Sequence, residues 1–529
     1  MDLPKEFNTT GPCNGRDHYM VPALSRLAEV PDLVRRGKYF VVHAPRQTGK
    51  TTTLKHVARQ LNSEGRFAAL YFSCEAGEAA ADDYAEAQKI IIQSIRLEAE
   101  SQLPLRLHPP DTEAGNLPDG SLLLTFLRRW AAACPKPLAL FFDEIDALRG
   151  QSLVSVLRQL RMGYDNRPDH APWSVALCGL RDVRDYRAAS GADTSRFGTS
   201  SPFNIKVTSL VLDNFTADEV DTLYTQHTEE TGQRFDEAAR ARAFELTQGQ
   251  PWLVNSLAAE VLYAMGVTGT ITAADIERAK ERLILARATH LDSLVARLHE
   301  PAVQRVLAPL ITEPSAQTAT QDFTYNDDFS YVRDLGLIAR DYPARPANPI
   351  YREVIIRGLT ANYEPQIAVE PARFILPDGR FDMRGAMDAF ADFWRQHGRG
   401  LTQRGVTYPE ATPHIILMAF LQRVVNGGGF IDREYGLGRG SVDVYVRWPI
   451  HGDAHHVQQE VIEIKRWASR GNPLPDALTQ IERYLQALSL DSGWMVIFDQ
   501  RQAALADVPQ TRFEVHETTS ARRVEVLWA

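Results

Sequence analysis

The chain has 529 residues, with 58 lysine and arginine residues against 67 aspartate and glutamate residues, which gives a net charge of −9. This balance excludes a polybasic protein that coats nucleic acid over its whole surface, because phosphate binding needs a basic footprint. Only nine of the basic residues are lysines, and Lys465 is the single lysine after Lys280. Since lysine and arginine differ in geometry and in how far their pKa can be tuned, a lysine in such a background is a candidate for a position that arginine cannot fill. Lys50 and Lys465 are the two candidates, and the other seven lysines look incidental.

The length predicts about three to five domains. The four cysteines show no CxxC spacing, which favours a reducing cytoplasm over a disulfide framework or a zinc site. The sequence contains no run of about 18 apolar residues, and its first residues lack the basic-then-apolar pattern of a signal peptide. We therefore expect a cytoplasmic protein that does not bind membranes.

Residues 1–205 have the pattern of an α/β domain. Short apolar runs at 39–43, 67–73, 137–144 and 173–179 are separated by segments with helical spacing. Continuous apolar strands that alternate with helices are typical of a parallel sheet covered on both faces.

A phosphate-binding loop follows the first of these runs. Residues 44–51 read APRQTGKT, with alanine in place of the first glycine of the usual pattern. Backbone N–H groups of such a loop point at phosphates, Lys50 reaches the β- and γ-phosphates, and Thr51 offers a hydroxyl to Mg²⁺. The residues expected to bind ATP are Ala44, Pro45, Arg46, Gln47, Thr48, Gly49, Lys50, Thr51 and Thr52.

The run LALFFDE delivers two acids to the carboxyl edge of the predicted sheet, where open α/β sheets bind ligands. Asp143 is expected to hold the metal ion. Glu144 is expected to orient or deprotonate the attacking water.

These motifs make the first 290 residues or so resemble the STAND/AAA-type P-loop ATPases, in particular a bacterial and archaeal group whose loop reads APRQTGKTT. The resemblance implies that Arg181 senses the γ-phosphate, that Arg196 is an arginine finger, and that Pro251 of the Gly-Gln-Pro motif contacts the nucleotide. Two alternatives stay open: the arginines are ordinary solvated side chains, and the Gly-Gln-Pro turn is a helix cap.

Residues 206–290 turn helical and are expected to form the lid of the ATPase. Residues 291–362 predict helices at 301–311 and 327–338, then two extended runs around a Pro-rich turn at 338–355, an order that resembles a winged helix. Seven arginines and ten acids lie between 290 and 364, a net charge of −3, and the second helix opens with Asn-Asp-Asp. Because these acids repel phosphate, we expect this module to bind the ATPase or a partner subunit, as in a homo-oligomer, rather than DNA.

Residues 363–400 predict a partly helical connector, and residues 401–529 predict the order helix, three strands, helix, strand. Asp443 lies in the second strand, and Glu463 and Lys465 lie two residues apart in the third, so all three can share one face of a sheet. Two carboxylates can chelate Mg²⁺ or Mn²⁺, and the lysine can position or deprotonate a water that attacks a phosphodiester.

This order and spacing resemble the PD-(D/E)XK nuclease superfamily, with valine rather than proline before Asp443. The resemblance implies that Gln480 and Tyr484 form a QxxxY element at the active site, and that Glu410, or instead Glu434, supplements the metal site. The alternative interpretation is an ordinary ion pair between Lys465 and an acid on an exposed sheet face.

Together, the patterns predict an ATP-binding and ATP-hydrolysing switch coupled to a metal-dependent nuclease, with DNA rather than RNA as the expected substrate. Family resemblance points to prokaryotic defence or the control of mobile DNA. Two other functions stay open: a motor-nuclease that moves along DNA, and a signalling scaffold whose nuclease fold does not cleave.

Overall fold

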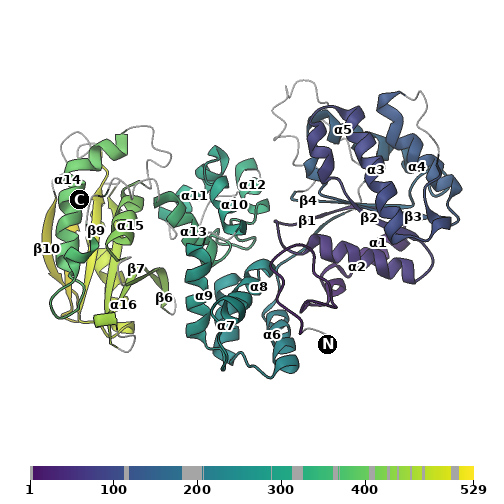
Figure 1. Cartoon of the computed structure of the whole chain (residues 1–529). Coiled ribbons are helices and arrows are strands. Elements are labelled where there is room, and N and C mark those ends of the chain that lie inside the picture. Colours follow the sequence, from purple (N-terminus) through teal and green to yellow (C-terminus); the bar gives the residue numbers. More distant parts are fainter. Residues whose placement is uncertain are drawn as a thin grey trace. The chain divides into compact units, whose positions relative to one another are not determined.

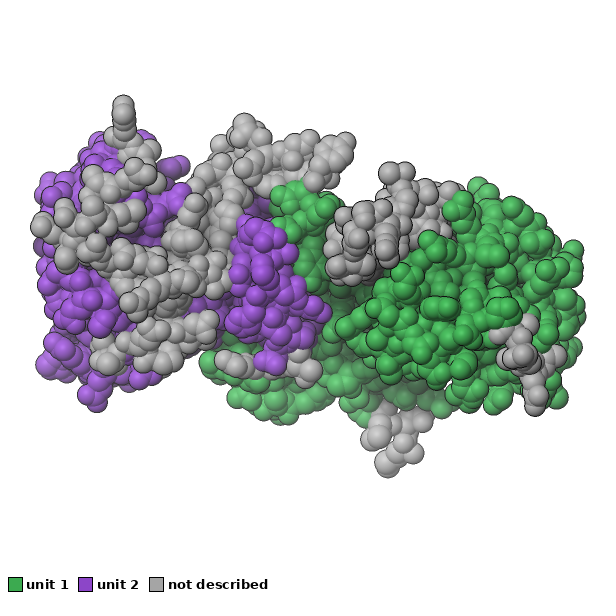
Figure 2. All heavy atoms as spheres, turned by 90° about the horizontal axis from the view of Figure 1, so that it is seen from above, with its two compact units in different colours: residues 1–288, 322–341, 347–350 green, residues 289–321, 342–346, 351–529 purple. Residues whose placement is uncertain are grey.

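The computed structural model describes residues 4–111, 118–181, 205, 208–286, 289–312, 326–360, 367, 370–403, 412–425, 429–437, 440–452, 456–467, 471–501 and 511–529. The chain divides into two compact units, coloured in Figure 2. The first contains residues 1–288, 322–341 and 347–350, and the second contains residues 289–321, 342–346 and 351–529.

The first unit is built on a parallel five-stranded sheet with the order β2-β3-β4-β1-β5. Figure 1 labels β1, β2, β3 and β4 of this sheet among the helices of the unit. The four apolar runs of the sequence form four of these strands, because helices on both faces bury them along almost their whole length. The fifth strand was not predicted; it pairs with β1 and extends the sheet past residue 205. The strands are β1 (Tyr39–His43), β2 (Ala68–Ser73), β3 (Leu138–Asp143), β4 (Ser174–Gly179) and β5 (Ser209–Val211).

Helices cover both faces of this sheet. Two helices bury Val34, Leu54 and Val57 against one face, and three helices bury Ile91, Trp130 and other apolar side chains against the opposite face. The helices of the first face are α1 (Val30–Arg35) and α2 (Lys50–Ser63), and those of the second are α3 (Tyr84–Gln102), α4 (Leu122–Ala133) and α5 (Gly150–Gly163).

Four helices follow the sheet, as expected for a lid. Capping boxes at Thr216 and Thr272 define where two of them begin, because each threonine hydroxyl accepts the backbone N–H three residues later. The helices are α6 (Ala217–Thr231), α7 (Glu237–Thr247), α8 (Pro251–Ala259) and α9 (Ala273–Leu285).

The segment expected to be a winged helix contains the two predicted helices, but the first extended run of the predicted hairpin is reduced to a single bridge residue, Ile338, and the second run is helical. The Leu337 carbonyl accepts the N–H of Ala347, and a helix then begins at Pro349. Ile350, Val354 and Ile355 are buried at helical spacing, and proline is favourable in the first turn of a helix, which explains why this run is not extended. The helices are α10 (Thr289–Arg297), α11 (Pro301–Thr312), α12 (Asp327–Asp334) and α13 (Pro349–Thr360).

The C-terminal part of the second unit is a mixed six-stranded sheet with the order β10-β11-β9-β8-β7-β6. The predicted order of one helix, three strands, a helix and a strand is confirmed, and β10 and β11 complete the sheet without having been predicted. The strands are β6 (Phe430–Leu437), β7 (Gly440–Pro449), β8 (Val457–Trp467), β9 (Ser492–Asp499), β10 (Arg512–Glu517) and β11 (Arg523–Trp528).

Helices lie on both faces of this second sheet as well. Helix α16 (Leu474–Ala487) buries Ile481 on the face that carries Val461 and Met495. On the opposite face, Phe390 of α14 (Met383–Gln403) contacts Phe420 of α15 (Thr412–Val425) and Phe498 of β9. Helix α14 begins inside the predicted connector and packs as part of this domain. The domain boundaries at 205, 290, 362 and 400 otherwise remain predictions.

None of the helices in the described ranges has the length and hydrophobicity needed to cross a lipid bilayer.

Candidate functional site

The phosphate-binding loop connects β1 to α2 in the first unit. Gly49 caps α2 with a φ of 90°, and Gln47 has a φ of 58°, so the loop uses left-handed conformations that turn successive N–H groups in one direction. The Lys50 ammonium donates hydrogen bonds to the carbonyls of Ala44 at 2.9 Å and Pro45 at 2.8 Å. The Thr48 hydroxyl donates to the same Pro45 carbonyl at 2.9 Å, which closes the loop.

Asp143, the last residue of β3, lies directly against the loop. Its Oδ2 accepts hydrogen bonds from the hydroxyls of Thr51 at 2.6 Å and Tyr71 at 2.9 Å, and its Oδ1 accepts the N–H of Glu144 at 3.0 Å. A hydroxyl and a carboxylate side by side at a helix N-terminus are oxygen donors of the kind that Mg²⁺ takes in phosphate sites. Thr51 and Asp143 therefore fit the metal that accompanies ATP.

Glu144 follows Asp143 in a left-handed conformation, with a φ of 51°. Burial raises the pKa of Glu144 above its usual value, and the nearby Lys50 charge partly opposes this shift. A carboxylate with a raised pKa at the pocket wall is suited to orient or accept a proton from an attacking water.

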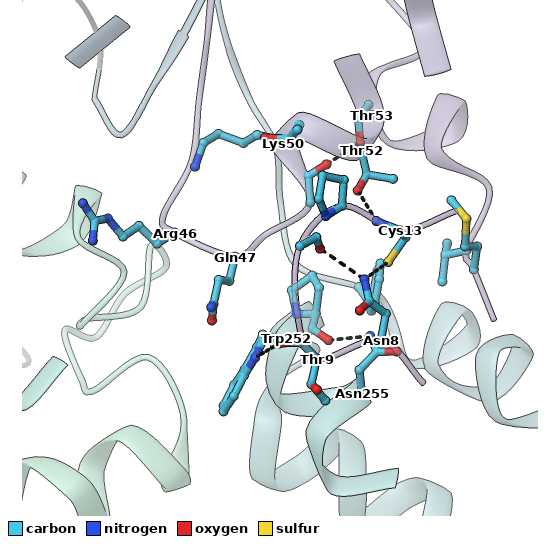
Figure 3. Close-up of a pocket in the computed structure, with 18 of the residues that line it drawn as sticks. Asn8, Thr9, Cys13, Arg46, Gln47, Lys50, Thr52, Thr53, Trp252 and Asn255 are labelled. Atoms are coloured by element: carbon cyan, nitrogen blue, oxygen red, sulfur yellow. Dashed lines mark hydrogen bonds between the residues drawn. The ribbon is translucent and has the colours of Figure 1, made fainter. Parts of the chain in front are cut away.

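A pocket of about 410 Å³ opens beside the loop (Figure 3). Arg46, Gln47, Lys50, Thr51 and Thr52 line it together with Glu144 and Pro251, so it brings together most of the residues predicted to bind ATP.

The N-terminal segment contributes to the same pocket, which the sequence analysis missed. The Cys13 N–H donates to the Thr52 hydroxyl at 3.0 Å, and the Trp252 indole N–H donates to the Thr9 carbonyl at 2.9 Å (Figure 3). These two hydrogen bonds attach the N-terminal segment to α2, which follows the phosphate-binding loop, and to α8 of the lid. Its sequence has no motif spacing, so only a long-range contact could identify it.

Arg26 is a second residue that the sequence did not indicate. Its guanidinium donates to the Thr48 carbonyl at 3.0 Å and to the Asp213 carbonyl, and it lies 4.8 Å from the ring centre of Phe215. Burial lowers the pKa of Arg26 to about 10. The side chain joins the phosphate-binding loop to the segment that leads into the lid.

The Gly-Gln-Pro motif lies at the start of α8. Gly249 has a φ of 70°, and a Cβ there would lie 1.8 Å from the Phe215 carbonyl oxygen, so only glycine fits. The Gln250 side chain caps α8 by accepting the Leu253 N–H at 2.6 Å, and Pro251 occupies the first turn and lines the pocket. The motif thus combines the helix cap with a position at the nucleotide pocket.

Arg181 follows β4 and contacts an aromatic ring, while its expected role as a sensor of the γ-phosphate stays a prediction. Its guanidinium carbon lies 3.8 Å from the ring centre of Tyr331 on α12. Gly336, just after α12, lies so near the loop that a Cβ there would be 2.7 Å from Cβ of Pro45. Residues of the predicted winged helix therefore pack against the ATPase site within the first unit. Arg196 lies outside the described residues.

A second cluster of predicted residues lies on β7 and β8 of the second unit. The β7–β8 ladder ends with the pair Val444 and Ile462, so Asp443 and Glu463 are next to each other just beyond it. Asp443 Oδ2 accepts the N–H of Ile464 at 2.7 Å, and the Lys465 ammonium donates to Glu463 Oε1 at 2.5 Å.

Glu463 is fully buried, and its Oε2 has no hydrogen-bond partner. Burial, and secondarily the negative charge of Asp443, raise the pKa of Glu463 to about 8, although Lys465 opposes the shift. The pKa of Lys465 is raised because the charges of Glu463 and Asp443 outweigh its own desolvation. Three charged groups therefore share one partly closed site.

The QxxxY pair of α16 lies over this face of the sheet. The Gln480 amide donates to the Tyr484 hydroxyl at 2.9 Å, and burial raises the pKa of Tyr484, with the charges of Glu463 and Asp443 adding to the effect. Glu410 and the side chain of Glu434 lie outside the described residues.

Within the described ranges, no three His, Cys, Asp or Glu side chains form a group that could hold a metal by themselves. Asp443 and Glu463 supply two carboxylates, one with an unpartnered oxygen, which fits a Mg²⁺ ion whose other ligands are water and substrate phosphate.

Comparison with known proteins identifies the first of these sites. Residues 34–186 match the AAA domain family, and the C-terminal sheet domain lies outside the match. The chain therefore contains an AAA-type P-loop ATPase domain, which binds and hydrolyses ATP and, by family, uses Mg²⁺. No curated protein matches the chain.

Three solved structures are similar to parts of the chain. A Walker-type ATPase of Pyrococcus abyssi is 16% identical, with a TM-score of 0.46 over 66% of this chain and 99% of that chain. The RuvB Holliday junction branch migration motor of Thermotoga maritima is 15% identical, with a TM-score of 0.34 over 62% and 92%. Cdc6p of Pyrobaculum aerophilum is 14% identical, with a TM-score of 0.35 over 65% and 96%.

Proposed function

We propose that this protein is an ATP-dependent switch whose AAA-type ATPase domain controls a metal-dependent nuclease site in the C-terminal sheet domain. The observation that carries the nuclease proposal is the buried Glu463 carboxylate, which has an unpartnered oxygen beside Asp443 and Lys465. An ordinary surface ion pair would be exposed and worth little, whereas this carboxylate has no exposed surface.

A buried carboxylate next to another acid is costly unless a cation or a proton compensates it. The Lys465 ammonium pairs with Oε1 of Glu463, and the buried Oε2 has no hydrogen-bond partner. A divalent ion between Asp443 and Glu463 would remove that cost, and it would supply Lewis-acid activation of a phosphodiester and of the attacking water.

The protein side chains then have separate roles in cleavage. Asp443 is held by the Ile464 N–H, so its second oxygen keeps a fixed direction. In this proposal the Lys465 ammonium, bound to Glu463, orients the attacking water or stabilises charge on the phosphate. Gln480 and Tyr484, which are hydrogen-bonded to each other on α16, are proposed to contact the scissile strand.

The switch proposal is supported by the packing of α12 on the ATPase. Arg181 follows β4, and its guanidinium carbon lies 3.8 Å from the ring centre of Tyr331 on α12. A change in nucleotide that moves Arg181 or the loop residue Pro45 would therefore also move α12 or Gly336, which lies two residues after α12. We propose that this contact transmits the nucleotide state, and that the winged-helix region binds a partner or a second copy rather than DNA.

The test incubates the purified full chain with supercoiled plasmid, linear DNA and RNA, in Mg²⁺ or Mn²⁺, with and without ATP. Wild type is expected to cleave DNA in a metal-dependent and ATP-dependent way. Lys465→Ala is expected to abolish cleavage while ATP hydrolysis continues, and Glu517→Gln, which changes an exposed acid of the same sheet, is the matched control.

Each result decides one part of the proposal. If wild type cleaves nothing, or if Lys465→Ala cleaves as wild type does, there is no nuclease at this site. If Lys50→Ala cleaves with the same ATP response as wild type, the ATPase does not control the nuclease. DNA-stimulated ATP hydrolysis with movement along the strand would replace the switch with a motor.

A further inference from the structure

Tyr71 reaches the metal-binding carboxylate of the ATPase site from a neighbouring strand. Strands β2 and β3 are parallel, with Tyr71 paired to Phe141, so Asp143 lies two residues further toward the carboxyl edge. The phenol spans this offset, and its hydroxyl donates to Asp143 Oδ2 at 2.9 Å. The Tyr71 side chain is buried, with 4% of its surface exposed, so water does not compete for this bond.

The Asp143 carboxylate is held from several sides at once. Thr51 of α2 donates to the same Oδ2 as Tyr71, and on β4 the buried Cys178 lies near enough that burial, and then the charge of Asp143, raise the pKa of its thiol. Tyr71 and Cys178 come from the two strands that flank β3. The rotamer of Asp143 is therefore set by its neighbours in the sheet and not by the phosphate-binding loop alone.

Tyr71 can act only as a hydrogen-bond donor here. Burial raises the pKa of Tyr71 far above its usual value, and the negative charge of Asp143 raises it further. The Lys55 ammonium, one helical turn after Thr51, lies 4.9 Å from the centre of the same ring. This contact packs the ring between the sheet and the helix that carries the phosphate-binding residues.

We infer that Tyr71 is a positioning residue for Mg²⁺–ATP. Its hydroxyl fixes Asp143 in the orientation in which one carboxylate oxygen meets the Thr51 hydroxyl, which is the pair of oxygens that fits the metal ion. Partners that orient a metal ligand typically change metal affinity by about 10- to 100-fold when removed. Tyr71 belongs to no motif of the sequence and is not among the residues that line the pocket.

The test is Tyr71→Phe in the full chain, which deletes one oxygen and keeps the ring. Binding of a fluorescent ATP analogue is measured first in EDTA and then during titration with Mg²⁺. We expect unchanged binding in EDTA and an apparent Mg²⁺ affinity of the nucleotide complex that is lower by about tenfold. In turnover, kcat should fall while the KM for ATP at saturating Mg²⁺ stays the same.

Tyr39→Phe is the matched control. Tyr39 lies in β1 of the same sheet, is fully buried, and donates its hydroxyl to the Pro172 carbonyl at 2.8 Å, at a distance from the loop. Both variants lose a buried tyrosine hydrogen bond, so both should lose a similar amount of thermal stability.

Only Tyr71→Phe should lose the rise in melting temperature that Mg²⁺ adds at saturating ATP, and this readout does not depend on turnover. The inference is overturned if both variants keep the wild-type Mg²⁺ response. It is equally overturned if Tyr71→Phe weakens binding in EDTA as much as in Mg²⁺, because the hydroxyl would then support the pocket in general.

Discussion

The two clusters of charged residues in this chain combine lysine with carboxylates in opposite ways. At the ATPase site, Lys50 donates to two backbone carbonyls, and both oxygens of Asp143 accept hydrogen bonds. At the C-terminal site, Lys465 donates directly to Glu463, whose other oxygen is buried without a partner.

This difference indicates how the first site would bind phosphate and how the second would bind a divalent ion. At the ATPase site, Lys50 and both oxygens of Asp143 make hydrogen bonds within the protein, and the backbone N–H groups of the loop form the surface that binds phosphate. At the C-terminal site two neighbouring carboxylates share one ammonium, and the buried Oε2 of Glu463 has no hydrogen-bond partner, a cost that a proton or a bound cation can relieve. The first site is preorganised by the backbone, whereas the second is expected to depend strongly on pH and on divalent ions.

The largest effect is expected from Lys50→Ala. Removing the ammonium that reaches the β- and γ-phosphates should reduce ATP hydrolysis by about 100-fold or more, measured as phosphate release. The exposed Lys89 on α3 provides the control, because Lys89→Ala removes a lysine far from the loop. Hydrolysis by Lys50→Ala at the control rate would mean that the phosphate-binding loop is not the catalytic one.

Glu463→Gln tests the buried carboxylate of the second site. The pKa of Glu463 is raised from 4.5 to about 8 on folding, so the folded chain holds this proton more tightly than the unfolded chain. The contribution of this group to the unfolding free energy is therefore present below pH 4.5 and lost as the pH rises through about 8. Glutamine cannot ionise, so the variant should be more stable than wild type at pH 8 in EDTA, by on the order of a few kcal/mol.

The measurement is thermal and urea unfolding between pH 5 and pH 9, with and without Mg²⁺ or Mn²⁺. Divalent ions should stabilise wild type, and more so as the pH rises, but should leave Glu463→Gln unchanged. Glu517→Gln should follow wild type throughout. A variant that is less stable than wild type at every pH would show that Glu463 forms a favourable ion pair and no metal site.

Tyr331→Leu probes the contact between α12 and Arg181. A cation–π contact is worth about 0.5–1 kcal/mol at a partly exposed site, so its loss should change the ATP turnover rate by about two- to fivefold. We expect an increase, because Arg181 becomes available to the nucleotide. Tyr331→Phe keeps the ring and should behave as wild type; identical rates in both variants would remove Tyr331 from the switch.

The smallest effect is expected from Gly336→Ala, paired with Gly232→Ala. Both glycines have a φ of 78°, so alanine strains both by about 1 kcal/mol. At Gly336 the new Cβ would lie 2.6 Å from the nearest Pro45 ring atom, whereas at Gly232 nothing lies within 4 Å. Only Gly336→Ala should shift the KM for ATP, by about twofold, and equal KM values would show that the loop does not sense this contact.

The parts of the fold that could be predicted are those encoded locally. The strand before Lys50 and the strand before Asp143 are continuous apolar runs, and their burial on both faces of a parallel sheet explains why the pattern was readable. Strand β5 has only three residues, all partly exposed, so the sequence does not indicate it as a buried strand. Helix α13 follows a Pro-rich turn, and the sequence predicts an extended run in its place.

The residues of the candidate sites also divide into those that a sequence motif predicts and those that only the structure reveals. Lys50, Asp143 and Lys465 stand in motifs whose spacing carries their chemistry. Tyr71 and Arg26 stand in no motif, because each acts through a partner more than 20 residues away.

The sequence by itself determined the phosphate-binding loop, the acids that end β3, and the order of helices and strands around Asp443, Glu463 and Lys465. These features follow from residues that are neighbours along the chain or alternate along one strand. Only the tertiary structure decided that Glu463 is wholly buried with one oxygen unpaired, that Tyr71 holds Asp143, and that Arg181 meets Tyr331. Burial and long-range contacts are set by how whole elements pack, and no local pattern encodes them.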